Sequence, residues 1–126
     1  MFEYTLTLNS SQTREVLKAV ELLMRLKLGQ YREIPFALVD INDDDFCKKR
    51  DNSEPLLKTA FDVLYKNKEK WKDEEWYRLY NLYQVIRKNL HDAENPNGKG
   101  IDGDPPLQFT DEPLPKMEWK KNERII

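Results

Sequence analysis

The sequence predicts an α+β domain that is mostly helical, with three main helices, a short N-terminal strand and an extended, proline-rich C-terminal strap. Three observations lead to this prediction. Apolar residues recur at helical spacing in three stretches, they alternate with polar residues near the N-terminus, and prolines cluster near the C-terminus. We expect one domain, 1–126, with a helical body at 9–94 and the strap at 101–126.

The N-terminal strand is predicted from strict alternation of apolar and polar residues. Successive side chains of a strand point to opposite faces, so this alternation is typical of a strand with one buried face. The end of the strap is a candidate partner for the strand. The apolar set is Phe2, Tyr4, Leu6 and Leu8, and the polar set is Glu3, Thr5 and Thr7.

The first helix is predicted over residues 9–31, and the rest of the chain is organised around it. Asn9 can cap it with its side-chain oxygen, and Gln12 stands where a capping-box partner belongs. Gly29 can take the left-handed conformation that ends a helix. The apolar face is formed by Val16, Ala19, Val20, Leu23 and Leu26.

After Pro35, which discourages a continuous helix, residues 36–41 form a short apolar run. We favour a helical turn or irregular structure over a buried strand here. The acidic run 42–45 lacks the ligand spacing of a calcium loop, so we expect it to cap a short helical turn at 45–50. The triplet 48–50 (Lys-Lys-Arg) is predicted to pair locally with these acids.

A second helix is predicted from Ser53 to about residue 67, because Ser53, Glu54 and Pro55 are typical of a helix start. Lysines surround Trp71 in the stretch 66–72, a pattern that can bind nucleic acid. We favour an exposed link between two helices for this stretch.

The third helix begins at the acidic run 73–75 and carries an unusually wide apolar face rich in aromatic residues. That face either covers both other helices or forms part of a homodimer seam. We therefore select Trp76, Tyr80 and Tyr83 as candidate partner-binding residues.

The net charge, the lengths of the apolar runs and the counts of cysteine and histidine disfavour several classes of function. The formal net charge is -2 although 35% of the residues are charged, so a nucleic-acid binder is disfavoured. We expect no membrane span and no signal peptide, hence a cytoplasmic protein. Cys47 is the chain's one cysteine and His91 its one histidine, and no spacing pairs either with a second catalytic group. We predict no enzyme activity, no metal and no cofactor.

One cluster of residues is a candidate anion site. Arg25, Lys27, Gln30 and Tyr31 gather at the exit of the first helix, and Arg87 on the third helix can face them. Cations beside an aromatic ring suit a nucleotide phosphate and base. The alternative is that Arg25 and Arg87 pair with nearby carboxylates.

Four stretches resemble small proteins of tailed bacteriophages, and together with the residues between them the likeness covers most of the chain apart from residues 40–52. The first contains an Arg-x-x-x-Gly-Gln-aromatic helix exit, and the last two form a proline-rich end. The stretches are residues 21–31, 84–87, 104–109 and 112–116. The resemblance implies a viral protein in the cytoplasm of a bacterial host, and it carries no catalytic residues.

Three functions follow as expectations. The first is a non-enzymatic inhibitor that binds a host protein, such as a component of a defence system, through the aromatic helix face. The second is a sponge that sequesters an anionic nucleotide second messenger at Arg25, Tyr31 and Arg87. The third is a structural, homo-oligomeric phage accessory protein, and we expect a homo-oligomer in any of these roles.

Overall fold

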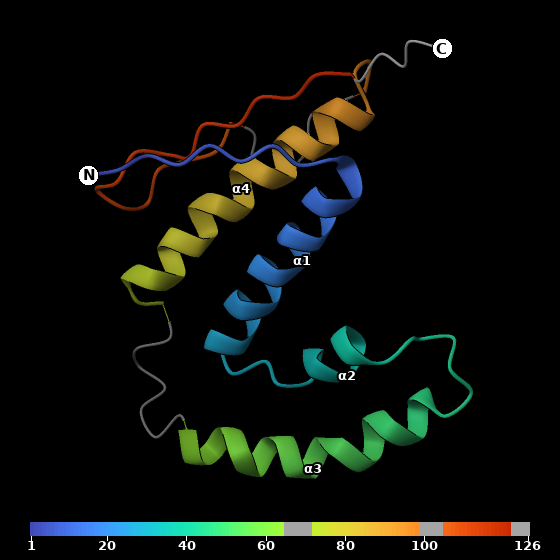
Figure 1. The fold of residues 1–126 in the computed structure, drawn as a ribbon. Helices are drawn as coiled ribbons and strands as arrows, with labels where there is room; N and C mark the ends of the chain where they lie inside the picture. Colours follow the sequence, from blue (N-terminus) through green and yellow to red (C-terminus); the bar gives the residue numbers. More distant parts are fainter. Residues whose placement is uncertain (65–71, 99–104, 122–126) are drawn as a thin grey trace.

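A computed structural model describes residues 1–64, 72–98 and 105–121 of the chain. In these residues the protein contains four helices and no strand (Figure 1). The prediction of an α+β fold is therefore wrong, because the described chain is all-helical. The helices are α1 (Ser10–Lys27), α2 (Glu33–Leu38), α3 (Phe46–Leu64) and α4 (Glu74–Glu94).

The predicted N-terminal strand is the main error. Residues 1–8 run outside any helix, and the side chains of Phe2, Tyr4 and Leu6 are 85%, 91% and 76% exposed. Alternation favours an extended backbone, but a strand also needs a neighbour that accepts and donates its ladder hydrogen bonds. The strap does not offer that neighbour, because its backbone groups at Leu107 and Phe109 bond to side chains of α4.

The body of the fold is the antiparallel pair α1 and α4 (Figure 1). Ion pairs join the two helices at both ends, Arg14 to Glu94 and Lys27 to Asp73. Between them the indole N–H of Trp76 donates to the carbonyl of Met24 at 3.2 Å. Trp76 and Met24 are each 7% exposed, so the core lies in this seam.

The predicted helix ends of α1 are confirmed. The Asn9 side chain accepts from the Gln12 amide at 2.8 Å, and the Gln12 side chain accepts from the Asn9 amide at 3.0 Å. Gly29 has a φ of 76°, the left-handed conformation expected after a helix. Asp73 caps α4 by accepting from the Trp76 amide at 2.8 Å.

The predicted start of the second helix at Ser53 is wrong. Helix α3 begins at Phe46 and continues through Pro55, so the predicted turn at 45–50 and the predicted second helix are one element. Proline inside a helix removes one backbone hydrogen bond, and packing on a neighbour can offset that loss. Phe46 supplies such packing, because it is 4% exposed and its ring lies 5.2 Å from that of Phe36.

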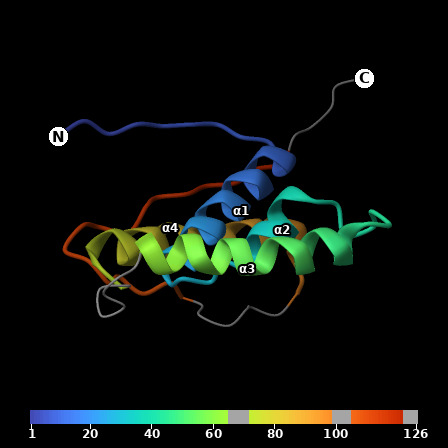
Figure 2. The ribbon, with the colours of Figure 1, turned by 90° about the horizontal axis from the view of Figure 1, so that it is seen from below.

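Helices α2 and α3 form an arm at the end of α1. Among the described helices, α3 packs against α2 alone (Figures 1 and 2). Two further contacts reach α3 from the turn before α2: the Tyr31 ring lies 5.7 Å from that of Phe61, and Arg32 donates to Glu54 at 2.8 Å. The arm therefore depends on few contacts and leaves most of α3 uncovered.

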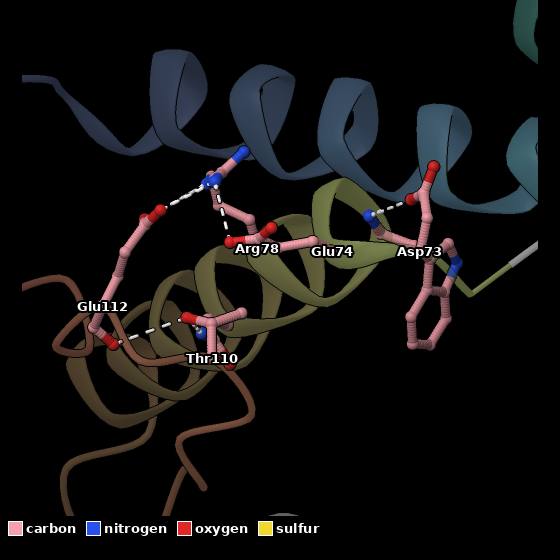
Figure 3. A network of polar contacts seen from close by, with 7 residues as sticks. Asp73, Glu74, Arg78, Thr110 and Glu112 are labelled. Atoms are coloured by element: carbon pink, nitrogen blue, oxygen red, sulfur yellow. Dashed lines mark hydrogen bonds and ion pairs between the residues drawn. The ribbon is translucent and has the colours of Figure 1, made fainter.

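The strap lies along α4 and is held by three polar side chains spaced three residues apart. The Gln84 amide bonds to both the carbonyl and the N–H of Leu107, at 2.9 and 3.0 Å. One turn earlier, Asn81 accepts from the Phe109 amide at 3.1 Å. One turn earlier again, Arg78 binds the Glu112 carboxylate at 2.7 Å (Figure 3). We call Arg78, Asn81 and Gln84 the polar ladder.

Two sequence predictions fall outside the described residues. They are the basic link around Trp71, of which only Lys72 is described, and the apolar pair Ile125 and Ile126 at the end of the strap. The Lys72 ammonium lies 5.2 Å from the centre of the Trp76 ring, a cation–π contact.

The polar ladder generates a stability prediction. We expect Gln84→Leu to leave two backbone groups of the strap without their partner and to lower the free energy of unfolding by about 1–3 kcal/mol. Urea unfolding measures this, and hydrogen exchange at the Leu107 amide should become faster. The control is Gln108→Leu, whose exposed amide bonds only within the strap, to Thr110. Equal losses in both variants would contradict the ladder's role.

Candidate functional site

The predicted anion site has its cations already paired. Arg25 contacts Glu21 at 3.0 Å, Glu33 at 3.5 Å and the side-chain oxygen of Gln30 at 3.3 Å. The hydrogen bond that Arg25 donates to Glu21 is the main reason that the pKa of Arg25 is raised. A phosphate would have to displace these carboxylates, which carry the same sign of charge.

Lys27 is directed to the start of α4. Its ammonium lies 3.2 Å from Asp73 and 3.4 Å from Glu75, and its side chain is 18% exposed. Desolvation lowers its pKa, but the hydrogen bonds and charges of the two acids outweigh this, so the pKa is raised. Lys27 therefore joins α1 to α4, whereas the Tyr31 ring packs against Phe61 of α3.

Arg87 lies on the same side of α4 as Tyr83, with its guanidinium carbon 5.9 Å from the ring centre. The structure thus brings Arg25 and Gln30 together, while Lys27, Tyr31 and Arg87 have separate neighbours. The two cavities described below are lined by none of these five residues.

The candidate partner-binding rings form a stack in which Trp76 is buried and Tyr80 and Tyr83 are half-buried. The Trp76 ring lies 5.3 Å from Tyr80 and nearly parallel to it, and Tyr80 lies 6.2 Å from Tyr83. Phe109 of the strap closes the stack at 5.3 Å from Tyr80. Helix α1 and the strap therefore share the wide apolar face of α4, and a protein partner would meet little of Trp76.

The other candidates named from the sequence are the acidic turn at 42–45, Cys47 and His91. The Asp43 carboxylate accepts from the Asp45 amide at 2.8 Å and from Lys49 at 3.0 Å, a local pairing that the sequence predicted. Cys47 is exposed on α3 and His91 lies in the last turn of α4, on helices that do not pack together. Within the described ranges, no group of three or more His, Cys, Asp or Glu residues is placed to hold a metal ion.

A groove between α2 and α3 was missed by the sequence reasoning. It encloses about 290 Å³, with Pro35, Phe36 and Leu57 as its apolar part. Two ion pairs form its rim, Arg32 with Glu54 at 2.8 Å and Arg50 with Asp51 at 3.1 Å. We call this the α2–α3 groove. The apolar run 36–41 was the only sequence signal for it, and that run does not indicate which helix lies opposite.

The rim of the groove is balanced in charge. The pKa values of Arg32 and Arg50 are raised mainly by the hydrogen bonds that these arginines donate to Glu54 and Asp51. Both arginines therefore stay charged beside their own acids. An apolar pocket surrounded by paired charges suits an apolar side chain of a protein better than a phosphate.

Further exposed apolar side chains lie on the arm, outside the lining of the groove. The most exposed of them on α3 recur at helical spacing, which places them along one flank of the helix. Monomeric proteins seldom expose large apolar side chains in such a group. These side chains, with exposed fractions of 78%, 74%, 66% and 72%, are Leu38 of α2 and Leu56, Val63 and Leu64 of α3.

A second cavity of about 330 Å³ lies where the strap crosses the first turn of α4. Its lining includes Glu74, Tyr77, Phe109, Thr110 and Asp111. The rings of Tyr77 and Phe109 are 5.9 Å apart, and Thr110 receives a hydrogen bond from Asn81 (Figure 3). This cavity is a consequence of the strap's path and is more open to solvent than the groove.

Comparison of the chain with protein-family models, with curated proteins and with solved structures gives no match. Among the described residues, every helix is too short or too polar to cross a membrane.

The junction of Lys27 and Asp73 generates a pH prediction. The hydrogen bond from the Trp76 amide, followed by the Lys27 contact, lowers the pKa of Asp73. A carboxylate with a lowered pKa in the folded state stabilises the fold above about pH 4 and loses that effect as pH falls through its folded pKa. We expect wild-type stability to fall more steeply below pH 4 than that of Asp73→Asn in urea unfolding.

The control for this measurement is Asp44→Asn, which removes the same charge in the turn before α3, away from the α1–α4 junction. Its acid profile should follow that of the wild type. Parallel profiles for wild type and Asp73→Asn below pH 4 would contradict the role of Asp73.

Proposed function

We propose that the chain is a non-enzymatic binding protein that occupies a host bacterial protein and thereby inhibits it, in the manner that the bacteriophage resemblance implies. The observation that supports the proposal is the α2–α3 groove, an apolar hollow on an arm that the rest of the described chain leaves uncovered. The proposal assigns no bond-breaking chemistry to the chain.

The shape of the groove supports recognition of a protein. Binding energy at protein interfaces concentrates where one apolar or aromatic side chain enters a pocket from which surrounding contacts exclude water. Pro35, Phe36 and Leu57 supply such a pocket, and the pairs Arg32–Glu54 and Arg50–Asp51 supply the polar rim.

We therefore propose that the partner binds the arm, and not the aromatic face of α4 that the sequence indicated. Trp76 is buried against α1, and Tyr80 is covered by Phe109 of the strap. A protein that bound these rings would first have to remove the strap from the polar ladder, whereas the arm needs no such rearrangement.

The nucleotide sponge is a weaker alternative. It needs Arg25 and Lys27 to meet a phosphate, and four carboxylates already lie within 3.5 Å of these two cations. A phosphate could therefore bind Arg25 and Lys27 only after the existing ion pairs of these two residues had broken.

Affinity capture tests the proposed function. Tagged full-length chain is mixed with lysate of a candidate host, and the intact complex is weighed by native mass spectrometry. We expect one host protein bound in a fixed ratio, and we expect Leu57→Asp to reduce its recovery at least tenfold, because a carboxylate in the groove opposes burial of an apolar side chain.

The control variant is Trp119→Asp, which introduces the same charge at a 48% exposed ring in the strap. It should leave the recovery of the partner unchanged, and circular dichroism should show equal helicity in all variants. Capture of a nucleotide, or equal loss in the groove and strap variants, would reject the groove as the binding surface.

A further inference from the structure

Helix α4 holds the strap mainly by its backbone. The Gln84 amide donates to the carbonyl of Leu107 at 2.9 Å and accepts from its N–H at 3.0 Å. Asn81 accepts from the N–H of Phe109 at 3.1 Å. In an extended chain the polar groups of alternate residues point to the same side, so one edge of the strap faces the helix. These backbone bonds do not depend on which side chains the extended segment carries.

Asn81 and Gln84 need a partner of this kind. The two residues are 3% and 9% exposed. Amides removed from water need hydrogen-bond partners, and the strap supplies them through its backbone. An extended backbone from another protein would supply the same partners in the same geometry. Helix α4 therefore has the polar groups of a site for extended peptide segments.

Two side chains of the strap add selectivity to this site. The Phe109 ring lies 5.3 Å from that of Tyr80 and 5.9 Å from that of Tyr77. Three residues later, the Glu112 carboxylate accepts from Nε and Nη2 of Arg78 at 2.9 and 2.7 Å (Figure 3). Aromatic rings and a two-pronged bond to a carboxylate both restrict what can bind. The site therefore favours an extended segment with an aromatic side chain and an acid three residues after it.

The strap is only partly packed against α4. Leu107 and Phe109 are 59% and 46% exposed. The open cavity of about 330 Å³ adjoins Phe109 and Thr110, with Glu74 and Tyr77 on the side of the helix. The strap thus leaves part of its site unfilled. A segment with a larger side chain at the place of Phe109 can bury more of the Tyr77 ring than the strap does.

We propose that α4 is a receptor for extended peptide segments, that the strap is its ligand within the chain, and that an aromatic and acidic segment of a partner protein takes the strap's place. This surface is separate from the α2–α3 groove and goes beyond the proposed function. The strap keeps the receptor closed, because a tethered ligand acts at a high effective concentration. Binding at α4 is therefore gated by release of the strap.

A second copy of this chain is a poorer occupant than a foreign segment. Exchange of straps between two copies replaces each contact of the polar ladder by an identical one. The exchange gains no hydrogen bond, while it costs the translational and rotational freedom of two separate molecules. A foreign segment can instead gain contacts in the cavity that the strap leaves unfilled.

The first test asks whether the strap leaves α4 as a unit. In hydrogen exchange of the full-length chain followed by NMR, the Leu107 and Phe109 amides should exchange at similar rates. Both should exchange about a hundredfold or more faster than the Val85 amide in the middle of α4, because local release needs less free energy than global unfolding. Equal protection of the strap amides and of Val85 would show that the strap opens only when the protein unfolds, and would overturn the proposal.

The second test measures peptide binding to the full-length chain by fluorescence anisotropy. The probe is a labelled synthetic peptide of residues 105–117. The open variant, which carries Phe109→Ser with Glu112→Gln in its own strap, should bind this peptide about tenfold or more tightly than the wild type does. The apparent dissociation constant is the intrinsic one divided by the fraction of receptors that are open, and these substitutions raise that fraction.

The matched control is Trp119→Ser with Glu118→Gln. It makes the same kinds of change in the strap, after the residues that bind the polar ladder. It should bind the peptide as weakly as the wild type does, and circular dichroism should show equal helicity in all variants. Equal affinity of the wild type and the open variant for the peptide, or no binding to either, would overturn the proposal.

Arg78→Gln tests whether the peptide binds where the strap lies. The Arg78 side chain is 45% exposed, so its loss should leave the helices folded. In the open variant, Arg78→Gln should weaken binding of the peptide by about threefold or more, because the bond to the carboxylate is lost. A peptide with Glu112→Gln should bind equally with and without Arg78→Gln. Binding of the unaltered peptide that ignores Arg78→Gln would overturn the proposal.

Two further measurements identify the occupant. Light scattering should give the same mass for the wild type and the open variant. A wild-type dimer that the open variant lacks would assign α4 to the strap of a second copy and overturn recognition of a foreign segment. Leu57→Asp in the α2–α3 groove should leave peptide binding unchanged. Failure of the groove as a binding surface and failure of α4 as a receptor are therefore distinguished.

Discussion

The hydrogen bond from the Trp76 indole to the Met24 carbonyl is the contact on which the rest of the structure depends. The Met24 carbonyl accepts from the Leu28 amide at 3.2 Å at the end of α1, and a carbonyl oxygen has a second lone pair that can accept from a further donor. Trp76 supplies that donor from the first turn of α4, and Asp73 caps the same turn while it binds Lys27. The end of α1 and the beginning of α4 are thereby fixed to one another.

Everything else is attached to this junction. The turn at Gly29 leaves it toward α2 and α3, and the aromatic stack that begins with Trp76 continues along α4 to the strap. The polar ladder then replaces the backbone partners that a neighbouring strand would have offered to the strap. The apolar face of α4 is in this way divided between a helix and an extended segment, and little of it is left for another protein.

The arm, unlike the apolar face of α4, leaves many of its apolar side chains exposed. Helix α3 meets the remainder of the described chain through Phe36, Tyr31 and Arg32, while Leu56, Val63 and Leu64 face solvent. Residues 1–8 expose their apolar side chains in the same way. Exposed apolar area of this extent lowers solubility unless something covers it. The exposed apolar side chains of the described residues therefore include those of the arm and of the N-terminal segment, while α1 and α4 form the packed body of the fold.

The sequence by itself determined the local features of this protein. The capping box of Asn9 and Gln12, the left-handed Gly29 and the cap at Asp73 all depend on residues within four positions of each other, so spacing was sufficient to predict them. Only the tertiary structure decided that residues 1–8 have no strand partner, that α3 continues through Pro55, that Gln84 holds the strap and that the groove lies between α2 and α3. Each of these depends on which distant segment lies opposite, and periodicity along one chain carries no information about the identity of that neighbour.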